Sequence, residues 1–237
     1  MKKFFTKLVF TIIIILIIVV GYFYFIGKSL YNTKIGEKSI SIKIEEIKKY
    51  KNYTTLDKVP KDYINAIIAV EDHRFYEHGA VDYLALVRAG AKNFKSKSLI
   101  EGGSTITQQV AKNLYFITDG DGIDRKVAEL MIAEELEKQF SKDEILELYI
   151  NIIYFGDGYY CVYDACMGYF NKKPIDMNLY ESTLLAGIPN APSIYAPTAN
   201  IELSKKRQQK VINDMIKYNY LTKEQAEKIV NYNLITK

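Results

Sequence analysis

Several residue types are scarce in this chain, and each shortage excludes a class of site. The sequence has no tryptophan, two histidines and two cysteines. The cysteines, Cys161 and Cys166, lie five positions apart without a histidine or second cysteine pair beside them, which argues against a zinc site. In an oxidising compartment they could form a disulfide, and the alternative is two buried free thiols on one helical stretch.

Common catalytic motifs are also missing. The sequence contains no G-x-S-x-G, no P-loop, no dinucleotide-binding glycine fingerprint and no H-E-x-x-H, so no organic cofactor is expected. It has no Ser-x-x-Lys or Lys-Thr-Gly either, which excludes an acyl-serine transpeptidase module from the 237 residues. A net charge of +4 is too small to indicate nucleic-acid binding, but it suits work beside an anionic membrane surface.

One long apolar run stands near the N-terminus. Three lysines precede residues 8–26, a stretch without a charge that can cross a hydrocarbon core of about 30 Å. Aromatic residues 22–25 close it, as in an interfacial belt. A cleaved signal peptide would have a shorter apolar region and a small-residue cleavage site. We therefore predict a single-pass anchor with a cytoplasmic N-terminus and residues 28–237 outside.

The remaining chain divides into a stalk and one domain. Residues 28–59 are rich in lysine, and Ile40, Ile42 and Ile44 alternate with polar residues as in a short strand. We predict an anchor over 1–27, a stalk over 28–59 and a mainly α domain over 60–237. Helices are expected near 61–71, 81–92, 104–115, 125–140, 141–151, 160–170, 177–188, 202–218 and 223–231. The prolines at 189, 192 and 197 predict an extended crossing.

The most informative acid is Glu71, which ends an apolar helical run just before His73 and His78. A carboxylate at the end of a buried approach is poorly solvated and can accept a proton. The alternative is a helix that ends at a solvated, charged turn.

Two further motifs could bind an anion. Glycines 102–103 lead into a helix whose first turn carries Ser104 and Thr105, and Gln108 shares a face with Lys112. Arg125, Lys126 and Glu129 begin the next predicted helix, where they could hold a pyrophosphate and its metal ion. The alternatives are an ordinary capped helix and a surface ion pair worth about 0.3–0.5 kcal/mol. Farther along, Glu147 and Asn151 could support either the core or a site.

Taken together and in order, these segments resemble the peptidoglycan glycosyltransferases of glycosyltransferase family 51. This domain occurs in monofunctional membrane-anchored transglycosylases and in class A penicillin-binding proteins. The resemblance spans about residues 53–231 and rests on Glu71-Asp72-x-x-Phe75-x-x-His78, Gly103-Ser104-Thr105-x-Thr107-Gln108-Gln109-x-x-Lys112, Arg125-Lys126-x-x-Glu129, Ser141-Lys142-x-x-Ile145-Leu146-Glu147-x-Tyr149-x-Asn151, Leu184-Leu185-Ala186-Gly187-x-Pro189 and Pro192-x-x-Tyr195-x-Pro197. Ala80 and Cys161 stand where the family usually has glycine.

The resemblance implies a lysozyme-like multi-helix glycosyltransferase domain behind a single transmembrane helix. The family polymerises lipid II, a disaccharide-pentapeptide on undecaprenyl pyrophosphate, with inversion, into a β-1,4 glycan at the outer face of the cytoplasmic membrane. By resemblance Glu71 is the general base and Glu129 the second acid. Lys112, Arg125 and Lys126 would stabilise the pyrophosphate leaving group.

The resemblance also implies supporting residues and partners. Asp72, Phe75, His78, Ser104, Thr105 and Gln108 would assist substrate binding, with His78 ordering the loop around Glu71. Mg²⁺ or Mn²⁺ is expected, with Glu129 as a candidate ligand. The expected partners are lipid II, the growing glycan, membrane lipid and wall-synthesis transpeptidases. Residues 94–100 would dip into lipid.

Two rival functions stay open at this point. A lysozyme-like hydrolase would share the fold and the central acid, but it has no need of the cations near Lys112 and Arg125. A non-catalytic scaffold of wall synthesis would have no need of Glu71 and Glu129.

Overall fold

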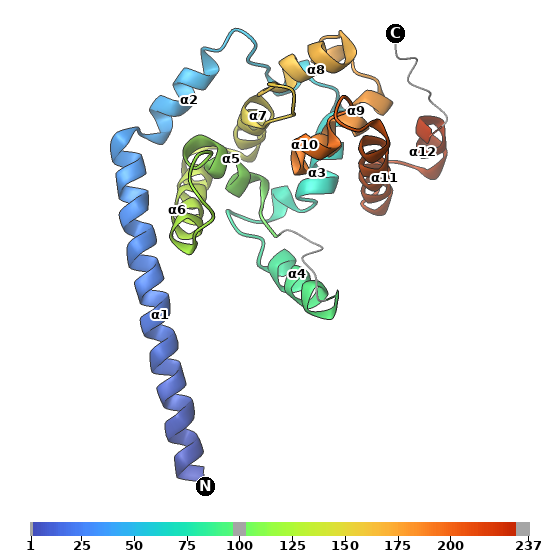
Figure 1. The fold of residues 1–237 in the computed structure, drawn as a ribbon. Helices are drawn as coiled ribbons and strands as arrows, with labels where there is room; N and C mark the ends of the chain where they lie inside the picture. The colour runs from blue at the N-terminus through green and yellow to red at the C-terminus, as the bar shows by residue number, and fades with distance from the viewer. Residues whose placement is uncertain (1, 97–102, 231–237) are drawn as a thin grey trace.

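The computed structural model describes residues 2–96 and 103–230, and every regular element in that part of the chain is a helix (Figure 1). The prediction of a mainly α fold is confirmed. The α-helices are α1 (Lys2–Glu37), α2 (Ile40–Lys48), α3 (Lys61–Glu71), α4 (Tyr83–Ser96), α5 (Ile106–Tyr115), α6 (Ile123–Gln139), α7 (Lys142–Ile152), α8 (Val162–Phe170), α9 (Leu179–Gly187), α10 (Pro192–Tyr195), α11 (Ile201–Lys217) and α12 (Lys223–Val230). Short 3₁₀ turns lie at Leu56–Lys58, Phe75–Glu77, Pro174–Asp176 and Ile188–Asn190.

Helix α1 combines the predicted anchor with part of the predicted stalk. Its apolar first half projects away from the domain with exposed side chains, and the helix is long and apolar enough to cross a membrane. Its second half packs along α6 (Figure 1). Gly27 is buried there because α6 approaches closely, and Leu30, Tyr31 and Ile35 pack against the core. At the far end of the contact, Lys34 Nζ lies 2.9 Å from Asp119 Oδ2.

The strand predicted over Ile40 to Ile44 is wrong, because these residues lie in α2. Ile40 and Ile44 are each 3% exposed, whereas Ile42 is 50% exposed. Residues four apart share one helix face, so the same alternation serves a helix whose two buried isoleucines dock on the domain. Ser39 caps this helix by accepting a hydrogen bond from the Ile42 N–H.

The core surrounds α3, which packs on α9 and α11, while α5 packs on α6 and α7. On α3, Tyr63, Ala66 and Ile67 are at most 1% exposed, and this face ends one turn before Glu71. Burying apolar area of this kind is the main favourable term in folding, at about 25 cal/mol per Å². The core therefore fixes the direction in which the last residue of α3 leaves the helix.

Local signals explain most helix boundaries. The predicted capping box at Ser141 and Glu144 is present at the start of α7. An equivalent box starts α9, where Asn178 and Glu181 bond reciprocally. The predicted extended crossing after α9 is wrong, because residues 188–190 form a 3₁₀ turn and α10 follows. Pro192 stands in the first turn of α10, where a missing N–H costs nothing.

The two cysteines are free thiols, with Cys166 buried and Cys161 half-buried. Cys166 packs its sulfur 3.3 Å from that of Met177 in the core. Of the two readings that the sequence allowed, the structure has the free thiols.

Candidate active site

A cleft with a volume of about 620 Å³ opens between α3, α4, α5, α6 and α11. Glu71, Gln109, Arg125, Glu129 and Arg207 all contribute to its wall. Two of them, Gln109 on α5 and Arg207 on α11, meet at the Glu71 carboxylate, although Arg207 is 136 positions away in the chain. A concave site with a few convergent polar groups is where ligand chemistry is expected.

Glu71 is the last residue of α3, and its side chain is 9% exposed. Gln109 Nε2 donates a hydrogen bond of 2.9 Å to its Oε2. Arg207 Nη2 from α11 donates to its Oε1 at 3.4 Å, and Arg207 Nε donates to the Gly187 carbonyl at 3.3 Å. The two donors fix the orientation of the carboxylate, whose oxygens are the atoms that would accept a proton.

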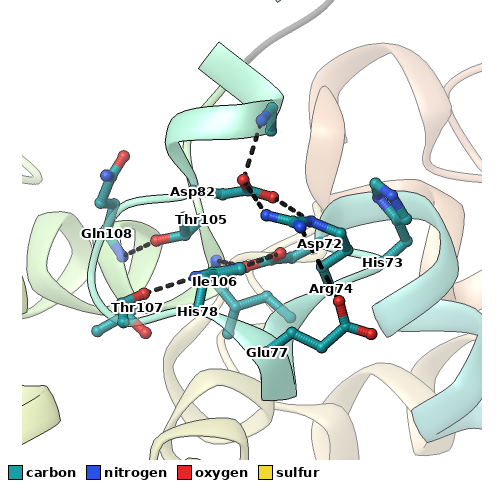
Figure 2. A network of polar contacts seen from close by, with 12 residues as sticks. Asp72, His73, Arg74, Glu77, His78, Asp82, Thr105, Ile106, Thr107 and Gln108 are labelled. Carbon is teal, nitrogen blue, oxygen red and sulfur yellow. Dashed lines mark hydrogen bonds and ion pairs between the residues drawn. The ribbon is translucent and has the colours of Figure 1, made fainter. Parts of the chain in front are cut away.

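The loop behind Glu71 is held by a polar network (Figure 2). Asp72 is 7% exposed and accepts hydrogen bonds from the Ile106 N–H at 3.1 Å and from His78 Nε2 at 2.7 Å. His78 Nδ1 lies 2.6 Å from the Gly79 carbonyl. Since both ring nitrogens face acceptor oxygens, both must carry protons, so His78 is an imidazolium.

The pKa of His78 agrees with this assignment. Burial alone lowers the pKa of His78, but the hydrogen bond to Asp72 and the charge of that carboxylate outweigh burial. The pKa of His78 therefore lies above its ordinary value. His78 orders the loop, and the structure does not bring it to the cleft wall.

Arg74 and Asp82 extend the network to α4. Arg74 Nε and Nη2 donate to the two oxygens of Asp82 at 3.1 and 2.5 Å, and Asp82 also accepts from the Ala85 N–H at 2.9 Å (Figure 2). Burial raises the pKa of Asp82, but the Arg74 and Ala85 bonds overcome this and bring it to about 2. The pair ties the loop after α3 to the first turn of α4.

The start of α5 closes the network from the other side. Thr105 caps α5 by accepting from the Gln108 N–H at 3.1 Å, and its hydroxyl donates to the Ala80 carbonyl at 2.8 Å. Gln108 Nε2 donates to the same carbonyl at 3.0 Å. Phe75 is fully buried under the Lys142 ammonium, away from the cleft wall. The polar atoms of Thr105 and Gln108 thus hold the loop, although both residues line the cleft.

The predicted cations come together at the opposite wall. Arg125 is 9% exposed, and its Nη1 donates to Glu129 Oε2 at 2.8 Å. Lys126 Nζ binds the other oxygen of Glu129 and also reaches Ser104 Oγ at 3.2 Å and Gln108 Oε1 at 3.4 Å. Lys112 is exposed in the same cleft. We call Lys112, Arg125 and Lys126 the α6 cation cluster, after the helix that carries two of them; Lys112 belongs to α5.

A second group of cations was not predicted from the sequence. Arg88, Lys210 and Lys217 line the part of the cleft formed by α4 and α11, and we call them the α11 cation cluster. His73 lies beside them, stacked on Tyr218 with ring centroids 4.1 Å apart, and is not a free surface residue. Burial, followed by the charges of Arg88 and Lys217, lowers the pKa of His73, so this ring is neutral.

The residues around Glu129 do not by themselves fit a divalent cation. Mg²⁺ requires near-octahedral oxygen ligands, whereas both oxygens of this single carboxylate already bind cationic side chains. Another trio, Asp72, His78 and Asp82, has ligand atoms within 4.8 Å of one another. There the His78 imidazolium and the Arg74 guanidinium supply the positive charge. The expected role of Mg²⁺ or Mn²⁺ stays a prediction.

Glu147 and Asn151, on α7, support the fold. Glu147 accepts hydrogen bonds from the Tyr53 hydroxyl at 2.7 Å and the Leu56 N–H at 3.1 Å. Asn151 bonds both the N–H and the carbonyl of Thr54 at 2.8 Å. These bonds fasten the segment between α2 and α3 to α7.

A helical domain behind an apolar N-terminal helix, with a nearly buried carboxylate and two cation clusters in one cleft, defines a candidate enzyme for anionic substrates. The family model described as Transglycosylase matches residues 38–216. The chain therefore belongs to the transglycosylase family, the peptidoglycan glycosyltransferases.

Relatives agree with this membership. The chain is 42% identical over 185 residues to penicillin-binding protein 1A of Aquifex aeolicus, covering 78% of this chain and 25% of that protein. It is also 42% identical over 165 residues to a putative transglycosylase of Cupriavidus necator, covering 70% of this chain and 71% of that protein. The fold was also compared with a crystal structure of penicillin-binding protein 1A from Haemophilus influenzae. The match covers 78% of this chain and 18% of the penicillin-binding protein, at 22% sequence identity and a TM-score of 0.48. That likeness is too distant to carry an argument.

The chain spans about a quarter of the length of the penicillin-binding relatives that it matches. Family membership alone therefore does not give this chain the activities, substrates and partners of those longer proteins.

Proposed function

We propose that this protein polymerises lipid II into β-1,4-linked glycan strands of peptidoglycan. The observation that carries the proposal is the position of Glu71, a nearly buried carboxylate in a cleft with cations on two sides. Such an arrangement suits two pyrophosphate-linked substrates, because each pyrophosphate can bind a group of cations while the carboxylate faces the reacting sugars.

In the proposed reaction the acceptor sugar's 4-hydroxyl attacks C1 of the donor sugar. Glu71 takes the hydroxyl proton as the new C–O bond forms, since a neutral sugar hydroxyl is a poor nucleophile. The bond from C1 to the pyrophosphate breaks with inversion, and the electron pair leaves on the pyrophosphate oxygen. Arg207 and Gln109 hold the carboxylate oriented for this transfer.

The α6 cation cluster suits the leaving pyrophosphate. Negative charge grows there as the bond to C1 breaks, and fixed cations stabilise it more in the transition state than in the ground state. Glu129 holds Arg125 and Lys126 in place through both of its oxygens. We assign Glu129 this positioning role.

The α11 cation cluster suits the pyrophosphate of the acceptor, which keeps its lipid during the reaction. Arg88, Lys210 and Lys217 line the cleft from α4 and α11, whereas Arg125 and Lys126 line it from α6. The Glu71 carboxylate would then lie between the two lipid-linked sugars.

In this proposal the apolar half of α1 holds the cleft at the membrane surface. Both substrates are lipid-borne, so an anchor keeps the domain at the outer leaflet, with the N-terminal lysines on the cytoplasmic side. The lipid-dipping role predicted for residues 94–100 falls outside the described residues, apart from the backbone of the end of α4. The test is the double variant Phe94→Ser/Leu99→Ser in the domain without its anchor. If this variant binds detergent-free membranes as well as the unsubstituted domain does, the lipid-dipping role is refuted.

Labelled lipid II incubated with the purified full-length protein tests the function. Polymer formation is expected, and Glu71→Gln should reduce it by about 10³-fold, while Glu77→Gln, at an exposed glutamate outside the cleft, should not. Release of muropeptides from finished wall would instead support the hydrolase. Full polymerisation by Glu71→Gln would reject our assignment, and the absence of both activities would support the scaffold.

The same assay addresses the metal. Polymerisation is expected to rise with Mg²⁺ or Mn²⁺ and to fall in a chelator, with the metal recruited by the substrate pyrophosphate. Equal rates with and without a chelator would contradict this expectation.

A further inference from the structure

A second cavity lies beside the catalytic cleft and is not explained by the motifs described above. It has a volume of about 520 Å³ and is formed by the end of α2 and the segment after it, the ends of α5 and α7, and residues 160–164. We call it the side groove, with Tyr50, Asn52, Asn113, Ile117, Tyr160 and Asp164 in its wall. Helix α2 and the following connection lie at the end of the domain opposite the N-terminus of α1 (Figure 1).

The side groove presents apolar and aromatic surface to solvent. Tyr50 is 73% exposed, Ile117 63% and Tyr160 57%. Clustered exposed side chains of this kind mark binding surfaces. Tyrosine offers a large rigid face at a low entropic cost, together with a hydroxyl. The C–H faces of pyranose rings match such faces, and side-chain amides match their hydroxyl and acetamido groups.

The charged side chains in the wall of the side groove are balanced, with Lys43 and Lys51 against Glu46 and Asp164, and three of the four have polar partners. Lys43 Nζ donates to the Leu114 carbonyl at 2.6 Å, and Glu46 bonds to Lys38 at 2.7 Å. Asp164 accepts from Asn52 at 2.6 Å. The thiol of Cys161 is neutral too, because burial raises its pKa to about 11. The side groove therefore suits an uncharged sugar backbone, in contrast to the cation-lined cleft.

The two cavities adjoin and share one wall residue. Asn113 lines both, and its amide nitrogen donates to the Gln109 carbonyl at 2.8 Å. Among the described residues the amide oxygen of Asn113 accepts no hydrogen bond. Tyr154 of the cleft wall and Tyr160 of the side groove have ring centroids 4.7 Å apart. An aromatic surface thus leads from one cavity to the other.

We propose that the side groove binds the already polymerised sugars of the growing glycan, an inference that rests on the proposed function. A chain whose lipid-linked end reacts in the cleft must leave it away from the membrane. The side groove lies on that path and has the chemistry for an oligosaccharide of N-acetylhexosamines. Binding there retains the product between additions, so the side groove sets chain length.

The test compares full-length wild type with Tyr50→Ala/Tyr160→Ala on labelled lipid II. The first coupling joins two monomers and leaves the side groove nearly empty, so its rate should change far less than the length of the later products. We expect the mean chain length at partial turnover to fall at least threefold. Ile42→Ala is the matched control, since Ile42 is 50% exposed on α2 outside the side-groove wall, and it should give wild-type lengths.

A binding measurement separates this proposal from the proposed function. In Glu71→Gln protein, a lipid-free octasaccharide of N-acetylglucosamine, which is uncharged, should bind at least fivefold more weakly when both tyrosines are alanine. Unchanged chain lengths or unchanged octasaccharide binding would overturn the proposal. So would variants that lose only vesicle binding or self-association, which would assign the tyrosines to lipid or to a second copy. Wild-type protein that binds the octasaccharide but makes no polymer would reject only the proposed function.

Discussion

At the scale of single residues, Glu71 depends on partners that its own motif does not contain. Gln109 comes from the start of α5 and Arg207 from α11, and each bonds one of its oxygens. Arg207 also lies 5.7 Å from the ring centroid of Tyr195, which limits its rotamers. The orientation of the carboxylate is therefore a property of three helices.

Arg207→Gln should reduce lipid II polymerisation by about 10²-fold, because misplacing a reacting group by about 1 Å costs that much. Arg207→Lys should recover part of the loss, since it restores the charge without the fixed geometry. The neighbouring exposed Lys206→Gln is the control and should be fully active. Wild-type activity in Arg207→Gln, measured as initial rates at saturating lipid II, would show that Arg207 does not position Glu71.

His78→Gln tests the imidazolium in the loop. Because the pKa of folded His78 is raised above its unfolded value, its contribution to stability is complete below about pH 6.5 and disappears as pH rises through the folded value. A hydrogen bond between charged partners contributes about 2 kcal/mol. The wild-type advantage in melting temperature over His78→Gln should therefore be large at pH 6 and small at pH 9. An advantage equal at both pH values would mean that His78 is neutral.

Some of the site could be predicted from the sequence because short spacings fix local geometry. Arg125 and Glu129 are four apart on one helix, so their pairing is predictable. Arg88 and Arg207 could not be assigned, since only the tertiary packing of α4 and α11 brings them to the cleft. Arg74 lies in the loop itself, but its pairing with Asp82 depends on where α4 begins. For the same reason Phe75 could be recognised as part of a motif, but not as a core residue.

At the scale of elements, boundaries with caps were predictable and those set by packing were not. The Ser141 box marks the start of α7 within the sequence itself. The helical state of α2 depends on Ile40 and Ile44 meeting the domain, which a period-two pattern does not reveal. Helix α1 likewise continues past the apolar run because its second half finds α6 as a partner.

Gly27→Leu should separate α1 from α6, because even a Cβ at this position would lie 2.5 Å from Val127 Cβ. Overpacking of this type costs about 1–3 kcal/mol, and α6 carries Arg125 and Lys126. We expect a lower melting temperature in detergent and slower polymerisation. Gly36→Leu on the same helix is the control, since nothing lies within 4 Å of its Cβ position. Equal effects of the two substitutions would contradict close packing at Gly27.

At the scale of the whole molecule, the apolar N-terminal helix and the α6 wall of the cleft form one unit. One face of α6 receives the second half of α1, and the first turn of the same helix carries Arg125 and Lys126. The cleft is therefore held at a fixed place relative to the apolar half of α1. In the proposed function, the side groove gives the product a path separate from the cleft.

Chains that begin at residues 27, 38 and 60 should differ in stability, which tests the predicted boundary of the domain at residue 60. A start at 27 keeps the packed half of α1, a start at 38 exposes the α6 surface around Val127, and a start at 60 also removes α2. Losing the buried Ile40 and Ile44 alone costs about 1.5–3 kcal/mol each. That is a large share of a typical stability of about 5–15 kcal/mol. Thermal unfolding and gel filtration should rank the three chains in this order, with the shortest aggregated. Equal melting temperatures for the starts at 27 and 60 would mean that residues 27–59 are a stalk after all.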